Sequence, residues 1–163
     1  MALQAFRRGY ERFLESICIA LMIALAAEVV AGVVFRYSGH SLVWYDEVAT
    51  ILLAWVTFYG SALAVLKHAH MGVPEIVRML PPGPRVAAAV VAQLCTMAFF
   101  VLLAWVGYSI LEILVDDRLV SLPEVSVAYA ISVIPISAVL FVVGQLLVFP
   151  EVLREARQEG KPA

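Results

Sequence analysis

The sequence predicts an all-α integral membrane protein with four transmembrane helices. Two observations predict it: the composition and the spacing of the apolar stretches. Of the 163 residues, 63% are apolar and 15% charged, whereas soluble domains contain roughly 45–50% apolar and about 25% charged residues. The mean hydropathy is +0.95. Four stretches supply the excess of apolar residues: 16–35, 48–66, 86–111 and 125–150.

Each stretch is about as long as the ~20 apolar residues that cross a hydrocarbon core roughly 30 Å thick. Allowing for helix ends, we expect spans at about 14–36, 46–67, 86–112 and 125–150. The segments between them are far shorter than the roughly 40 residues that a soluble domain needs to fold alone. Residues 1–163 are therefore expected to form a single membrane domain.

A short amphipathic helix is expected before the first span, at about residues 3–13, where apolar residues recur every three or four positions. Arg8 and Arg12 lie on another face, so this helix is expected to lie on the membrane surface before the chain turns inward. Residues 24–26 have the small-residue pattern of a signal-peptide cleavage site. Because the apolar run continues through Phe35, we expect the first span to be retained.

The later elements carry two proline signals. Residues 73–80 have apolar side chains at helical spacing and are followed by Pro81 and Pro82, which predicts a second short surface helix. In the fourth span, Pro135 is expected to bend the helix, because proline removes a hydrogen bond and clashes with the preceding turn.

Positive charge orients the four spans. Nine of the eleven lysine and arginine residues lie before the first span, between the second and third, or after the fourth. Only Arg36 and Arg118 lie in the other two connections. By the positive-inside rule, both termini are expected in the cytoplasm. Five acidic residues then face outward: Asp46, Glu47, Asp116, Asp117 and Glu124.

The composition also excludes several classes of function. A formal net charge of −2 leaves no basic surface for nucleic acid. No segment matches a nucleophile-elbow or nucleotide-binding glycine motif. His68 and His70 lie on one side of the predicted membrane and His40 on the other, so the three cannot meet around a haem or metal ion. We therefore expect no catalytic residues, no cofactor, no metal site and no enzymatic activity in this chain.

Glu28 is the only ionisable side chain well within a span, and an intramembrane carboxylate raises a functional hypothesis. In one interpretation it binds a proton or cation, and the chain is a small homo-oligomeric, proton-coupled multidrug exporter. In the other it bonds to a neighbouring helix, because it shares a face with Ala20, Ala24 and Gly32, which allow close approach. The second interpretation ranks first, since a solitary carrier normally needs discontinuous helices in two related halves.

The residues around the second span resemble a known family. Arg36 is followed by Trp44-Tyr45-Asp46-Glu47, by Trp55 and Phe58-Tyr59-Gly60-Ser61-Ala62, and by Lys67-His68-Ala69-His70-Met71-Gly72-Val73. This order, with the length and the four spans, is similar to the small membrane subunit of TRAP (tripartite ATP-independent periplasmic) transporters. Pro74 departs from the pattern, which has an acidic residue directly after the valine.

The resemblance implies a function. In such systems a periplasmic binding protein delivers an organic acid, such as a C4-dicarboxylate or sialic acid, to the inner membrane of a bacterium or archaeon. A large multispanning subunit binds the substrate and sodium and moves as an elevator. The small subunit is expected to brace the fixed scaffold of the large subunit and to help dock the binding protein, within the surrounding membrane lipids.

Carried over residue by residue, the resemblance points to structural or partner-interface residues: Arg36, Trp44, Glu47 and His70, beside Glu28. Trp44 is otherwise an ordinary headgroup-region aromatic, and Glu47 an ordinary carboxylate at a helix start. His70 is expected to bond a loop carbonyl or a lipid phosphate. The outward carboxylates either form a docking face for the periplasmic protein or stay solvated: Asp46, Asp116, Asp117 and Glu124.

Overall fold

The computed structural model describes residues 2–40, 42–67 and 81–158, and within these ranges the chain is α-helical, with no β-strand. The helices are α1 (Ala2–Tyr37), α2 (Tyr45–Leu66), α4 (Pro82–Ile113), α5 (Val127–Ile131) and α6 (Val133–Gln158). Four segments are long and apolar enough to cross a membrane: α1, α2, α4, and α5 together with α6. The predicted all-α membrane fold is confirmed.

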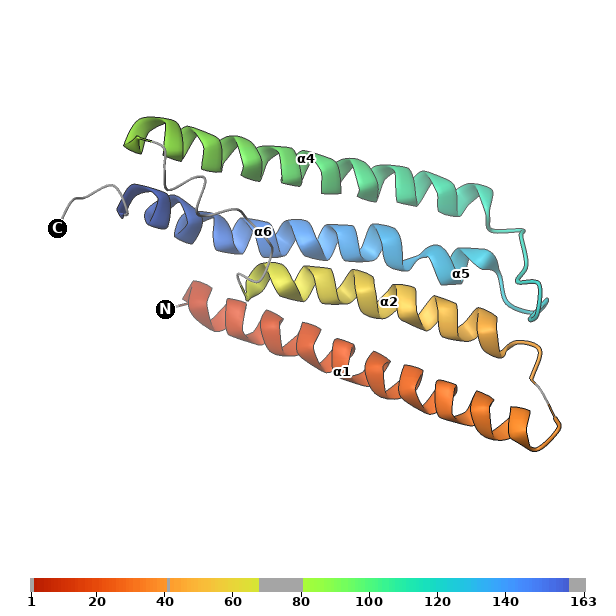
Figure 1. The fold of residues 1–163 in the computed structure, drawn as a ribbon. Helices are drawn as coiled ribbons and strands as arrows, with labels where there is room; N and C mark the ends of the chain where they lie inside the picture. Colours follow the sequence, from red (N-terminus) through yellow and green to blue (C-terminus); the bar gives the residue numbers. More distant parts are fainter. Residues whose placement is uncertain (1, 41, 68–80, 159–163) are drawn as a thin grey trace.

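The four spans lie side by side in a row rather than around a common centre (Figure 1). α1 packs on α2, α2 on α6, and α6 on α4, so the order in space is α1–α2–α6–α4. The most apolar stretch of the α5–α6 span is 44% buried inside the chain, against 11% for α1, 11% for α2 and 6% for α4. α6 is therefore the central helix, and the broad faces of the row remain largely uncovered.

The row has two distinct ends (Figure 1). At one end, here called the terminal end, lie the first turn of α1, the last turn of α2, the first turn of α4 and the last turn of α6. The opposite end, the loop end, carries the connection from α1 to α2 and the loop 114–126. Both ends of the described chain thus lie on one side, as a topology with both termini in the cytoplasm requires.

The N-terminal segment differs from the expectation of a separate surface helix at 3–13. Residues 2–37 form one continuous helix of 36 residues, about 54 Å long. No proline interrupts it, and Arg7 and Tyr10 hydrogen-bond to α2 and α6, which keeps the first turns in line with the span. The helix expected at 73–80 lies outside the described residues, as does His70.

The fourth span is interrupted where Pro135 predicts a disturbance. α5 ends at Ile131 and α6 begins at Val133, so the break at Ser132 lies within one turn before the proline. Pro135 cannot donate a backbone hydrogen bond, and its ring crowds the preceding turn. α6 then continues past the expected end at residue 150, through Pro150, to Gln158.

The buried core lies toward the terminal half of the row. Leu14 of α1, Leu66 of α2 and Phe141 of α6 are almost fully buried there. Phe100 of α4 stacks on Phe141, with ring centroids 3.5 Å apart and planes 10° from parallel. The buried cluster thus joins α1, α2 and α6, and the Phe100–Phe141 stack adds α4, so this core holds the four helices of the row together.

Candidate functional site

Glu47 ties the start of α2 to the loop 114–126. Its Oε1 accepts a hydrogen bond from the backbone N–H of Val120 at 3.2 Å, and its Oε2 accepts one from Ser121 at 2.8 Å. A carboxylate in the first turn also interacts favourably with the positive end of the helix dipole. The sequence interpretation that Glu47 bonds to a neighbouring segment therefore has a specific partner, the tip of this loop.

The loop 114–126 is folded on itself. Its backbone is held by hydrogen bonds from Leu119 N–H to Val125 O (3.0 Å) and from Val127 N–H to Asp117 O (2.9 Å). The Ser126 hydroxyl donates to Val115 O at 2.9 Å and accepts from Ala128 N–H at 3.2 Å, which caps α5. With Leu119 only 8% exposed, the loop is anchored on the helices.

Four exposed carboxylates share the loop end and form what we call the acidic loop face: Asp46, Asp116, Asp117 and Glu124. Three of them are carried by the folded loop and Asp46 by the first turn of α2. The backbone carbonyl of Asp117 accepts one of the hydrogen bonds that hold the loop, and the side chain of Asp117 is exposed. The structure thus brings the predicted docking residues to one end of the molecule on an ordered support.

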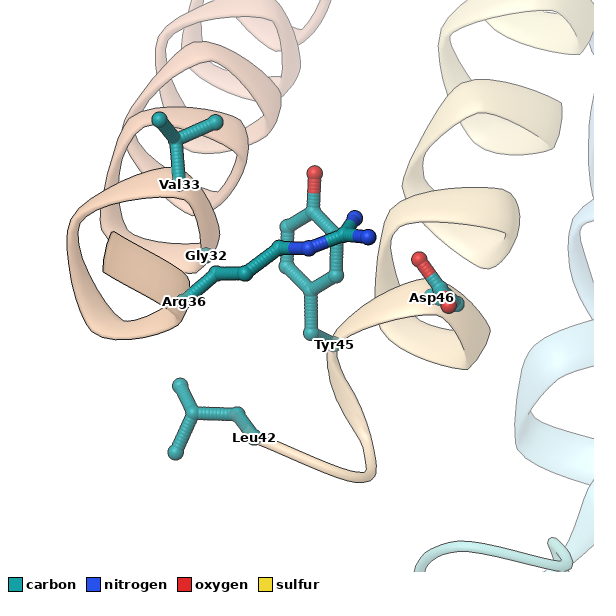
Figure 2. A pocket seen from close by; sticks show the side chains of 6 residues that line it. All are labelled: Gly32, Val33, Arg36, Leu42, Tyr45 and Asp46. Carbon is teal, nitrogen blue, oxygen red and sulfur yellow. The ribbon is translucent and has the colours of Figure 1, made fainter. Parts of the chain in front are cut away.

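A pocket lies between the last turns of α1 and the start of α2, lined by Gly32, Val33, Arg36, Leu42, Tyr45 and Asp46 (Figure 2). The ring of Tyr45 packs against the bare backbone of Gly32: a Cβ built on Gly32 would lie 2.0 Å from Cε2 of Tyr45. Arg36 reaches from α1 toward the first turn of α2. Trp44 precedes this turn as the N-cap residue and makes no side-chain cap hydrogen bond.

Glu28 lies one helical turn deeper than Gly32 on the same stripe of α1. Its side chain is partly buried, and Oε1 is shielded from solvent with no hydrogen-bond partner among the described residues. Within that part of the chain, no group of three histidine, cysteine or acidic side chains could hold a metal ion around it. Glu28 therefore stands apart from the other predicted site residues, inside the membrane-spanning part of α1.

Ion pairs at the terminal end join three helices. Arg7 of α1 bonds both carboxylate oxygens of Glu151 of α6 at 2.5 Å, and its Nη2 donates to Leu66 O of α2 at 2.8 Å. Lys67, directly after α2, pairs with Glu15 and lies 3.9 Å from Glu11. The hydrogen bond and charge of Glu15 raise the pKa of the Lys67 ammonium, which keeps this cation charged.

Several of these contacts were missed at the level of sequence. The Glu11–Glu15 spacing of four residues was a signal for a shared cation, since such residues lie on one helix face. The family resemblance includes Trp55 but gives it no partner, whereas its indole N–H donates to Ala130 O of α5 at 2.9 Å. Tyr45 gave no sequence signal for its contact with Gly32, because that contact depends on how the chain turns between α1 and α2.

Comparisons with known proteins identify the family. A sequence model of the tripartite ATP-independent periplasmic transporters, DctQ component, matches residues 25–155. The chain is 30% identical over 99 residues to the C4-dicarboxylate TRAP transporter small permease protein DctQ of Vibrio cholerae, covering 60% of this chain and 41% of that protein. It is 32% identical over 109 residues to the ectoine TRAP transporter small permease protein TeaB of Halomonas elongata, covering 65% of this chain and 56% of that protein.

The matched region thus spans about half the length of these relatives. The family match covers most of this chain. Of the four spans that the structure describes, it includes the last three in full and the C-terminal part of the first. The chain therefore belongs to the DctQ component family of TRAP transporters, as an inner-membrane protein of the small permease type.

Proposed function

We propose that this chain is the small permease subunit of a sodium-coupled TRAP transporter for uptake of an organic acid. In this proposal it braces the scaffold of a large membrane subunit, which binds sodium and substrate, and it helps to dock a periplasmic substrate-binding protein. The observation that carries the proposal is the exposed row of helices: three of the four spans are at most 11% buried within the chain. Such spans need lipid or another membrane protein to cover them.

A single row of helices also suits a bracing role better than a transport path. Small-molecule sites bury roughly 70–90% of the ligand surface, and one layer of helices contacts a ligand from one side only. The row would therefore need a second protein, or further copies of itself, to enclose a substrate. This geometry supports a subunit that contributes a rigid wall, with α6 as its centre.

The substrate class rests on the relatives and is part of the proposal. One similar protein is named for C4-dicarboxylates and another for ectoine. Both names describe solutes that carry a carboxylate, so an organic acid is the class that we infer. The acidic loop face would lie on the periplasmic side and would favour a binding protein with a basic docking surface.

Affinity purification of the tagged full chain from its native membrane in mild detergent, followed by mass spectrometry, tests the subunit role. We expect one much larger multispanning protein at about equal stoichiometry. A homo-oligomer alone would contradict the proposal and would favour the small-exporter interpretation, with Glu28 as its coupling residue.

Charge reversal tests the docking role separately. The triple substitution Asp116→Lys, Asp117→Lys and Glu124→Lys should weaken binding of the cognate periplasmic protein about tenfold at low salt, with a smaller effect at high salt. Arg154→Glu, a charge reversal at the terminal end, should leave this affinity unchanged. If the triple variant binds the periplasmic protein as tightly as the unaltered chain does, the acidic loop face is solvated and does not dock that protein. This result would not contradict the subunit role, which the purification tests separately.

A further inference from the structure

The pocket between α1 and α2 holds two opposite charges that do not pair with each other. Its cavity of about 290 Å³ contains the Arg36 guanidinium and the Asp46 carboxylate (Figure 2). Among the described residues neither side chain has an ion pair or hydrogen bond. The pocket therefore offers a cation and an anion, both accessible, to a ligand that carries the two complementary charges.

The depth of the pocket places it at the membrane surface. α2 has 22 residues and is about 33 Å long, close to the roughly 30 Å of a hydrocarbon core. Asp46 lies in the first turn of α2, while Lys67 follows its last turn. With these two charges at opposite membrane surfaces, the pocket lies at the depth of phospholipid headgroups.

The surface below the pocket is apolar. Val33 and Val29 precede Arg36 by three and seven residues on the same face of α1, and both are exposed. Tyr45 lines the pocket at the boundary, where an amphipathic ring is favourable. A molecule seated at Arg36 and Asp46 can therefore extend an apolar chain along α1 toward the membrane centre.

The geometry points to a binding site for the headgroup of a zwitterionic phospholipid with a primary ammonium, such as phosphatidylethanolamine. Arg36 binds the phosphate, since guanidinium donors match phosphate oxygens. Asp46 binds the ammonium, which donates hydrogen bonds that a quaternary choline group lacks. An anionic lipid without an ammonium would instead leave Asp46 unpaired beside its negative charge. This site does not depend on the proposed transport function.

Native mass spectrometry of the delipidated full chain in mild detergent tests the site without any substitution. The probes are phosphatidylethanolamine, phosphatidylcholine and phosphatidylglycerol with identical acyl chains. We expect phosphatidylethanolamine to bind one site about tenfold more tightly than either other lipid, the difference expected for one charge-assisted hydrogen bond. Equal affinity for all three lipids would overturn the proposal.

Substitutions locate the site. Arg36→Gln should weaken binding of phosphatidylethanolamine about tenfold. Asp46→Asn should weaken it similarly but strengthen binding of phosphatidylglycerol, because the repelling carboxylate is gone. Arg118→Gln and Asp116→Asn, matched changes on the loop 114–126, should alter neither affinity. The same change in affinity from the pocket and the control variants would overturn the assignment. So would a chain that no longer binds phosphatidylethanolamine when it is purified with its membrane partner.

Discussion

Replacing Gly32 by alanine is expected to displace the Tyr45 ring and weaken the contact between α1 and α2. The added Cβ would lie 2.0 Å from Cε2 and 2.1 Å from Cδ2 of Tyr45, whereas carbon atoms pack at about 3.5–4.0 Å. The ring must therefore retreat by roughly 1.5 Å. Overpacking of this kind costs about 1–3 kcal/mol, and the better helix propensity of alanine returns about 0.5–1 kcal/mol. The expected net loss is up to about 2.5 kcal/mol.

A double-mutant cycle measures this contact. The free energy of unfolding would be followed by circular dichroism in mixed micelles of mild detergent and SDS, for Gly32→Ala with and without Tyr45→Ala. Once the ring is removed, Gly32→Ala should be neutral or stabilising by up to about 1 kcal/mol. Gly60→Ala is the matched control, because a Cβ on this helical glycine of α2 would meet nothing within 4 Å.

Two results would refute the reasoning. The first is a loss of stability from Gly32→Ala that persists in the Tyr45→Ala background, because the ring could not then be its cause. The second is a Gly32→Ala variant as stable as Gly60→Ala, because the close approach of the Tyr45 ring would then cost nothing.

Three further predictions concern single side chains. Glu47→Ala should speed hydrogen exchange at the two loop amides that it binds, Val120 and Ser121, and unchanged exchange would contradict the tie between α2 and the loop. Trp55→Phe removes a hydrogen bond across helices and should cost about 0.5–1.5 kcal/mol of unfolding free energy, whereas Trp105→Phe, on an exposed indole, should cost less. Glu28→Gln should leave substrate uptake by the reconstituted transporter unchanged, and loss of coupling would favour the exporter interpretation.

The positions of the spans could be predicted from the sequence, because the length of an apolar run alone decides whether a helix can cross a membrane. The break in the fourth span followed from Pro135, since proline acts through its own ring on the preceding turn. The connection between Arg36 and α2 could be expected to be short. The sequence did not show that Tyr45 would turn back onto Gly32, because this contact requires a particular path through that connection.

The expected surface helix at 3–13 shows why local periodicity is insufficient. The same apolar spacing occurs in a helix lying on the membrane and in the first turns of a longer one. In this chain Arg7 bonds to Glu151, 144 residues away, and this long-range pair accompanies the continuous helix. Hydropathy likewise says nothing about which span lies beside which, so the order α1–α2–α6–α4 could only come from the structure.

This order has a consequence for how the protein is made. α6 lies between α2 and α4, yet it leaves the ribosome after both of them. Until it is inserted, the earlier spans lack the neighbour that joins them, and the place of Phe141 among them stays empty. The row is therefore expected to assemble only once α6 has been inserted, when the hairpin of α4 and α6 closes on the α1–α2 pair. In a chain that stops before α5, α4 should be only loosely associated with the α1–α2 pair. Membrane proteases should therefore degrade this chain readily.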